Sequence, residues 1–92
     1  MALNFEWDDK KAKSNLLKHK ISFEEASTAF GDDLSITIED PLHNESENRL
    51  ILIGKSIYHK TLVVVHLEQK DSIRIISARK ATKKEQRFYE ES

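Results

Sequence analysis

The 92-residue sequence contains no cysteine, one proline and two glycines. Without cysteine the chain forms neither disulfide bonds nor thiolate metal sites, and we expect an intracellular, cytoplasmic protein. With only Gly31 and Gly54, it cannot form a glycine-rich loop that cradles the phosphates of a nucleotide. No apolar run approaches the ~20 residues that span a membrane, and the first residues lack the pattern of a signal peptide. We therefore expect no association with a membrane.

The histidines do not form a recognisable metal motif. No two of them are four positions apart, the spacing that places two ligands on one helix face, and no cluster of acids accompanies them. The four are His19, His43, His59 and His66. The sequence therefore predicts neither a metal site nor a cofactor, and we assign His59 and His66 structural roles.

The length fits one domain, which we place at residues 1–92. Apolar residues make up 38% of the chain, and runs such as Leu62 to Val65 are able to fill a core. The core of a domain this small is modest, so a bound partner would raise its stability by mass action.

Charge is segregated along the chain although the net charge is only −1. Five lysines lie between Lys10 and Lys20, and five basic residues lie between Arg79 and Arg87. If the fold brings these segments together, they form one cationic surface; otherwise each is the solvated face of a helix. Residues 32–47 contain six acids and no Lys or Arg. We expect an acidic loop at residues 42–48, with Asp40 just before it and with Glu45 and Glu47 inside it, to lie away from the cationic surface.

Hydrophobic periodicity predicts a strand, two helices, four strands and a last helix, in that order. Helices are predicted from a cap at Asp8 to about His19, from a cap at Ser22 to a stop at Gly31, and from a cap at Thr82 through Tyr89. Strands are predicted at residues 4–7, 35–39, 49–53, 61–67 and 73–78, with a turn at Gly54-Lys55. Segregated runs of this kind predict an α+β fold. We expect an antiparallel meander sheet with two N-terminal helices and one C-terminal helix, packed on one sheet face.

A polar set near the C-terminus is the strongest candidate for chemistry. Its members are Arg74, Ser77, Arg79, Lys83, Glu85 and Tyr89. Arg74 and Arg79 are five positions apart, so in a regular strand they point to opposite faces, and they share a site only if a bulge or the strand end reorients Arg79. Glu85 and Tyr89 share one helix face.

These residue types suit the cleavage of RNA by its own 2′-hydroxyl. A base must take the 2′-hydroxyl proton, an acid must protonate the 5′-oxygen, and fixed positive charge must stabilise the dianionic phosphorane. Arg suits the third role because its planar, permanently charged fork matches phosphate. The same residue types also occur in ordinary surface ion pairs, so composition alone does not decide the function.

The segment from Arg74 to Tyr89 resembles the C-terminal signature of the BrnT toxins, in which R-I-I-S-A-R-x-A is followed by an acid and then an aromatic residue. The front half is similar too, in Phe5-Glu6-Trp7-Asp8, in Lys18-His19 and in Ser22 to Ala26. Two positions depart from the family pattern: Lys20 stands where Gly is usual, and Asn48 stands where Glu is usual before Arg49.

This resemblance implies a RelE-like fold and a type II toxin that halts translation by cleaving mRNA. It implies a BrnA-like antitoxin with a ribbon-helix-helix domain, through which alone the chain would reach operator DNA. Two alternatives remain open: a catalytically silent protein-interaction module, and a plain RNA-binding domain.

The catalytic candidates each have a structural alternative. They are Arg79, Arg74, Glu85, Tyr89, His19 and Arg49. Arg74 and Arg79 would stabilise charge or form ion pairs, and Arg49 would serve the site or be an ordinary surface arginine at a strand start. His19 would belong to the site or interact with the dipole at the end of its helix. Glu85 would act on a proton or complete a capping box, and Tyr89 would act as an acid or stacking platform or pack on the sheet. The lysines expected to hold the RNA backbone are Lys10, Lys11, Lys13, Lys83 and Lys84.

Overall fold

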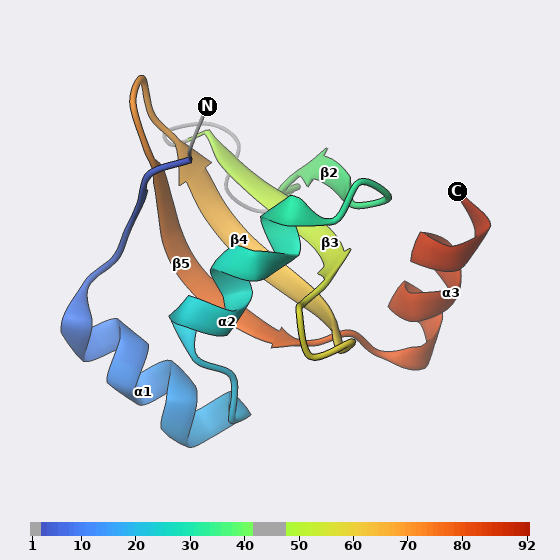
Figure 1. The fold of residues 1–92 in the computed structure, drawn as a ribbon, viewed down its shortest axis with the longest axis horizontal. Helices are drawn as coiled ribbons and strands as arrows, with labels where there is room; N and C mark the ends of the chain where they lie inside the picture. The colour runs from blue at the N-terminus through green and yellow to red at the C-terminus, as the bar shows by residue number, and fades with distance from the viewer. Residues whose placement is uncertain (1–2, 42–47) are drawn as a thin grey trace.

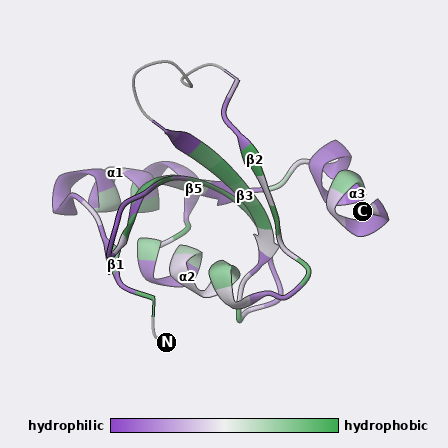
Figure 2. Ribbon diagram, turned by 90° about the horizontal axis from the view of Figure 1, so that it is seen from above, coloured by the Kyte–Doolittle hydropathy of each residue, from purple (hydrophilic) through white to green (hydrophobic). Residues whose placement is uncertain are grey.

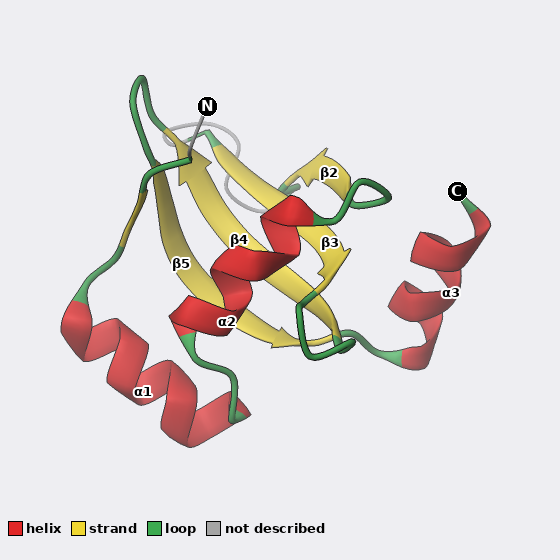
Figure 3. Cartoon of the chain, viewed as in Figure 1, coloured by secondary structure: helices red, strands yellow, loops and turns green. Residues whose placement is uncertain are grey.

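The computed structural model describes residues 3–41 and 48–92. Its elements in chain order are β1 (Phe5–Glu6), α1 (Asp9–His19), α2 (Phe23–Thr28), the 3-10 turn η1 (Ala29–Gly31), β2 (Ile36–Glu39), β3 (Arg49–Lys55), β4 (Thr61–Glu68), β5 (Ile73–Lys80) and α3 (Lys83–Glu91). This order is the predicted one, and Figure 3 shows the helices arranged around the sheet. None of the helices within these described ranges is long and apolar enough to cross a membrane.

The helix starts depend on side-chain caps that the sequence predicts. The carboxylate of Asp8 accepts the Lys10 backbone N–H at 2.8 Å, and Ser22 accepts the N–H of Glu25 at 3.0 Å. At the start of α3 the capping box is complete, because Thr82 and Glu85 each accept the other's backbone N–H. These contacts satisfy N–H groups that have no partner inside a helix.

The sheet has five strands in the order β1-β5-β4-β3-β2. Strands β2 to β5 pair antiparallel, but β1 pairs parallel with β5, with Phe5 opposite Ile73. The predicted antiparallel meander is therefore present in β2 to β5, but it does not describe the whole sheet, because the pair of β1 and β5 is parallel. Short turns force antiparallel pairing only between consecutive strands, whereas β1 reaches β5 through two helices and the rest of the sheet.

One face of the sheet carries α2 and the inner side of α1. The core on this face contains Ile21, Phe23, Ala26, Leu62, Val64, Ile75 and Ala78. Figure 1 shows α2 crossing in front of the sheet and α1 beside the β5 end of it. These apolar contacts supply the larger of the two cores.

The last helix packs on the opposite face, which corrects the prediction that all helices share one face. Tyr89 of α3 is buried against Ile53 and Val63, whereas their neighbours Leu52 and Val64 point toward α2. In Figure 2, β2 and β3 separate α2 from α3, and the strands are apolar over much of their length. Strands that are apolar at successive positions are able to bury both faces, so they do not fix the side on which a helix packs.

Gly54 lies inside β3 and not in a turn, contrary to the sequence prediction. The strand continues through Lys55, and the chain reverses between Ser56 and Lys60. A Cβ atom at Gly54 would lie 2.9 Å from the carbonyl oxygen of Ala29. The glycine is therefore required because the backbone of η1 approaches β3 closely.

A buried amide joins α1 to the free edge of β5. The Asn15 side chain donates to the carbonyl oxygens of Ile21 at 3.0 Å and Ala78 at 2.8 Å, and accepts the Ala78 N–H at 3.1 Å. β1 pairs with β5 only at Ile73 and Arg74. At Ala78 the Asn15 amide makes the hydrogen bonds that a neighbouring strand would otherwise make. The residue that follows is Arg79, so the contact also fixes the strand beside that side chain.

Replacing Asn15 by Ala should lower the free energy of unfolding by about 2–4 kcal/mol, because it leaves buried backbone groups of Ala78 and Ile21 without partners. Urea denaturation followed by circular dichroism measures this loss. Ser14→Ala, on the exposed side of the same helix, serves as the control and should change stability little. A loss for Asn15→Ala no larger than that for Ser14→Ala would contradict the assigned role.

His66 is fully buried in the sheet beneath η1. Its ring lies edge-to-face with Phe30 at 4.8 Å, and its Nδ1 donates to the carbonyl oxygen of Val64 at 3.2 Å. Burial lowers the pKa of His66, and the contact with Val64 only partly opposes this effect. The imidazole is therefore neutral in the folded protein, in agreement with a structural role.

The stability of the protein should fall as the pH drops below about 6.5, the pKa of unfolded histidine. The neutral form is favoured only in the folded state, so its contribution is complete above that pH and is lost below it. Between pH 7.5 and 5.5 we expect a loss of about 1 kcal/mol in urea denaturation. His66→Leu should show a smaller loss over this range, and an equal loss in both proteins would refute the assignment.

Candidate functional site

A β-bulge in β5 brings Arg74 and Arg79 to the same face of the sheet. Val65 lies opposite Ser77 and His66 lies opposite Ile75, so Ile76 is an extra residue in the strand. One extra residue inverts the alternation of side chains beyond it. Arg74 and Arg79, which a regular strand would place on opposite faces, therefore lie on the same face, which is the condition for a shared site.

This face is the one opposite α1 and α2, and we call it the open face. The register aligns Arg49, Leu67 and Arg74 in one row across it, and Ile53, Val63 and Arg79 in another. Between these rows lie Ile51, Val65 and Ser77. Helix α3 covers only the end near Ile53 and Val63. Leu67, Val65, Ser77 and the three arginines remain partly exposed, so the open face combines an aliphatic centre with guanidinium groups.

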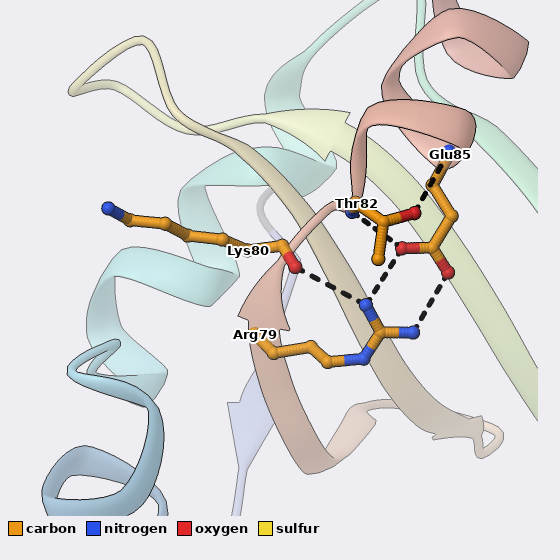
Figure 4. A network of polar contacts seen from close by, with 4 residues as sticks. All are labelled: Arg79, Lys80, Thr82 and Glu85. Carbon is orange, nitrogen blue, oxygen red and sulfur yellow. Dashed lines mark hydrogen bonds and ion pairs between the residues drawn. The ribbon is translucent and has the colours of Figure 1, made fainter.

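Arg79 is held in place by Glu85. Its two terminal nitrogens donate to the two carboxylate oxygens of Glu85, each at 2.8 Å, and one of them also donates to the Lys80 carbonyl at 3.3 Å (Figure 4). The same carboxylate accepts the Thr82 N–H at 2.8 Å. This is the ion pair that the sequence offers as the alternative to a catalytic role.

The pair shifts the protonation of both partners. Hydrogen bonds from Arg79, together with those from Thr82 and the nearby positive charge, lower the pKa of Glu85 to about 2 despite its partial burial. The same contacts raise the pKa of Arg79 above its usual value. Glu85 is therefore an ionised acceptor at neutral pH, occupied by the guanidinium and by the start of its own helix.

Tyr89 anchors α3 to the segment after η1. Its hydroxyl donates to Asp32 at 2.5 Å, and the same carboxylate accepts the N–H groups of Lys55 at 2.8 Å and Leu34 at 3.0 Å. The bond to Asp32, with burial, raises the pKa of Tyr89 to about 12. Burial alone would raise the pKa of Asp32, but these three hydrogen bonds outweigh it and lower that pKa. Tyr89 therefore keeps its proton at neutral pH.

Asp32 is the residue of this region that sequence reasoning did not identify. Its partner Tyr89 is 57 positions away, and no local pattern connects a carboxylate after a 3-10 turn with a tyrosine of the last helix. Only the packing of α3 across the open face creates the contact.

The other candidate arginines differ in their surroundings. Arg49 lines a hollow of about 380 Å³ together with Glu39 and Glu68, so acids lie near its charge. Within residues 3–41 and 48–92, no hydrogen bond or ion pair holds the side chain of Arg74. Arg74 is thus the arginine of the open face that is best placed to meet an added anion.

The basic helices do not combine into one surface. Helix α1, with Lys10, Lys11 and Lys13 exposed, belongs to the layer of α2, and α3 lies on the opposite side of the molecule (Figure 1). Lys83 and Lys84 are exposed in the first turn of α3, near the open face. His19 ends α1, apart from the open-face arginines. The acidic loop expected at residues 42–48 lies, except for Asn48, outside the described residues.

No group of three or more histidine and acidic side chains with the arrangement of a metal site occurs in the described part of the chain. The chemical groups that the open face offers are thus guanidinium, hydroxyl and carboxylate. Guanidinium groups in fixed positions bind and stabilise phosphoryl oxygens.

Comparisons with known proteins agree on one family. The sequence pattern of the family described as the ribonuclease toxin BrnT of type II toxin-antitoxin systems matches residues 7–85. The crystal structure of the Brucella abortus ribonuclease toxin BrnT superposes with a TM-score of 0.69 over 89% of this chain and 100% of that chain, at 19% sequence identity. No curated protein sequence matches this chain. Because the family pattern spans most of the sequence and the fold agrees with it, the chain belongs to the BrnT family of ribonuclease toxins.

Proposed function

We propose that this toxin is a metal-independent endoribonuclease with a RelE-like site, which cuts mRNA on the open face and thereby inhibits translation. The observation that carries the proposal is the bulge at Ile76, which sets Arg74 and Arg79 on one partly exposed face. The family assignment supplies the ribonuclease activity of the class. The alternatives of a silent interaction module and a plain RNA-binding domain become outcomes of the test below.

The proposed step is an internal transesterification. The 2′-hydroxyl loses its proton, its oxygen forms a bond to phosphorus, the bond from phosphorus to O5′ breaks, and O5′ takes up a proton. The products are a 2′,3′-cyclic phosphate and a 5′-hydroxyl. The pentavalent intermediate carries more negative charge than the substrate, so groups that meet this charge accelerate the reaction.

In this scheme Arg74 and Arg79 stabilise the phosphorane, and Glu85 positions Arg79. Glu85 is a poor base, because its pKa of about 2 and its bonds to Arg79 and Thr82 leave it little affinity for a proton. Tyr89 is a positioning residue as well, since its hydroxyl keeps its proton and donates a hydrogen bond to Asp32. The exposed Lys83 and Lys84 contact the RNA backbone beside the site.

The protein partner in this proposal is a BrnA-like antitoxin with a ribbon-helix-helix domain. The type II assignment of the family supports an antitoxin made of protein. The toxin would reach operator DNA only through that antitoxin, and the pair would act in the cytoplasm.

Arg74→Ala and Arg79→Ala should each reduce RNA cleavage by about 10²–10³-fold, the usual cost of removing one group that stabilises developing charge. Cleavage is measured in EDTA on a labelled mRNA with the purified toxin, and the new ends are tested for a cyclic or 3′-phosphate. Arg87→Ala removes an exposed arginine of α3 and serves as the matched control.

Undiminished cleavage in both folded arginine variants would overturn the proposed site. Binding of RNA by the wild-type protein without cleavage would favour the RNA-binding alternative, and an absence of both would favour the silent module.

Tyr89→Phe should lower the free energy of unfolding at pH 8 by about 1 kcal/mol and leave cleavage within a few-fold of wild type, because the hydroxyl anchors α3 and does not transfer a proton. The folded pKa of about 12 exceeds the unfolded value of 10.0, so this stabilisation is complete below pH 10 and is lost as the pH rises toward 12. Urea denaturation between pH 8 and 11 should show this loss in the wild type and a smaller one in Tyr89→Phe. A hundredfold loss of cleavage at unchanged stability would instead make Tyr89 a catalytic acid.

A further inference from the structure

A second basic feature lies where β3, β4 and β5 meet the start of α3. A hollow of about 250 Å³ there is lined by Lys55, His59, Lys60, Thr61, Lys80 and Gln86. None of these residues belongs to the site predicted from the sequence, and only the fold brings them together. We call this feature the basic hollow.

The sheet register explains why three lysines converge. Lys55 lies opposite Thr61 at the end of the β3–β4 pair, and Lys80 lies opposite Leu62 at the end of β5. The backbone N–H of Ser56 donates to the carbonyl of Lys60 at 2.8 Å and closes the turn. The cations therefore come from the ends of three adjacent strands.

The turn that carries Lys60 is held by hydrogen bonds to helix α2. The Ser56 hydroxyl donates to the buried carboxylate of Glu25 at 2.8 Å, and the N–H of Ile57 donates to the Thr28 hydroxyl at 3.0 Å. His59 has a φ of 64°, a left-handed conformation that is unfavourable for most residues other than glycine and asparagine. The rim of the hollow is thus a turn whose backbone is fixed by these hydrogen bonds, and it carries His59.

The basic hollow has an excess of positive charge that the described residues do not neutralise. No carboxylate lines it, and within residues 3–41 and 48–92 none of its lysines is in a salt bridge. The Lys80 side chain points away from the Glu85 carboxylate (Figure 4). The Asp32 carboxylate interacts with the charge of Lys55, so the excess positive charge of the hollow comes from Lys60 and Lys80. Cations that line one hollow without a carboxylate among them attract an anion.

We propose that the basic hollow binds a backbone phosphate of the RNA next to the phosphate that is cleaved. This inference rests on the proposed function. Lys55 and Thr61 form the row of the open face that comes next after the row of Ile53, Val63 and Arg79. On α3, Gln86 directly follows Glu85, the partner of Arg79. Lysine ammonium, imidazole N–H and amide N–H groups all donate to phosphate oxygens. Contacts to phosphate position a strand without reading its sequence, so the hollow holds the RNA in register on the open face.

The test measures the binding of a single-stranded 2′-O-methyl RNA oligonucleotide, which the proposed step cannot cleave, at a series of salt concentrations. The test variant is Lys60→Gln with Lys80→Gln. Its control is Lys18→Gln with Lys70→Gln, which removes the same charge from exposed positions of α1 and of the far end of the sheet. Circular dichroism confirms that both variants are folded. The test variant should bind about tenfold more weakly at low salt, and the slope of log K against log salt should shrink by about 0.7 for each phosphate that the variant no longer neutralises.

Equal affinity and equal slope in the test and control variants would overturn the inference. The readout is separate from catalysis. If the wild type binds through the basic hollow but cleaves no RNA, the proposed function fails while the hollow stands. If the wild type cleaves RNA and the test variant binds the oligonucleotide as the control does, the hollow fails while the proposed function stands.

Discussion

The irregular register between β4 and β5 determines what each face of the sheet presents. Before the extra residue Ile76, Ile75 points into the core beneath α2, and after it Ala78 does the same. Without that residue, the apolar positions of one half of β5 would share a face with the arginine of the other half. A regular strand would then bury Arg74 or Arg79, or expose apolar side chains. The bulge allows one continuous core and one arginine-bearing face to coexist in eight residues.

Local signals in the sequence predict most of the elements, because caps and alternation act over a few residues. Asp8, Ser22 and Thr82 cap helices as predicted. The parallel pairing of β1, the side on which α3 packs and the role of Gly54 depend on contacts between distant segments, which local patterns do not contain. The conformation of Lys20 is instructive: its φ is 63° at the end of α1. The BrnT resemblance places glycine at this position, and glycine is the residue that adopts this conformation without strain.

In the candidate site, too, local patterns predict some features, whereas others depend on contacts between distant segments. Residue type and spacing identify the arginines and show that they meet only across a bulge or a strand end, but neither periodicity nor spacing places the bulge at Ile76. The sequence alone also leaves Arg79 between catalysis and an ion pair with Glu85, and the structure shows the ion pair. Asp32 and the basic hollow were missed, because both depend on side chains that come from separate strands and helices. Residue type therefore identified the open face in part, and tertiary structure supplied the contacts that define it.

The pairing of Arg79 with Glu85 is compatible with catalysis on the open face. A carboxylate that occupies two guanidinium N–H groups fixes the plane of the side chain, and it weakens the attraction for a phosphodiester with a single negative charge. The phosphorane carries one more negative charge than the phosphodiester, so the guanidinium attracts the phosphorane more strongly than it attracts the substrate. A stabiliser that binds the ground state weakly and the transition state more strongly lowers the barrier to the chemical step. Under the proposed function, affinity for RNA would come from the lysines, whereas Arg74 and Arg79 would contribute mainly to the rate.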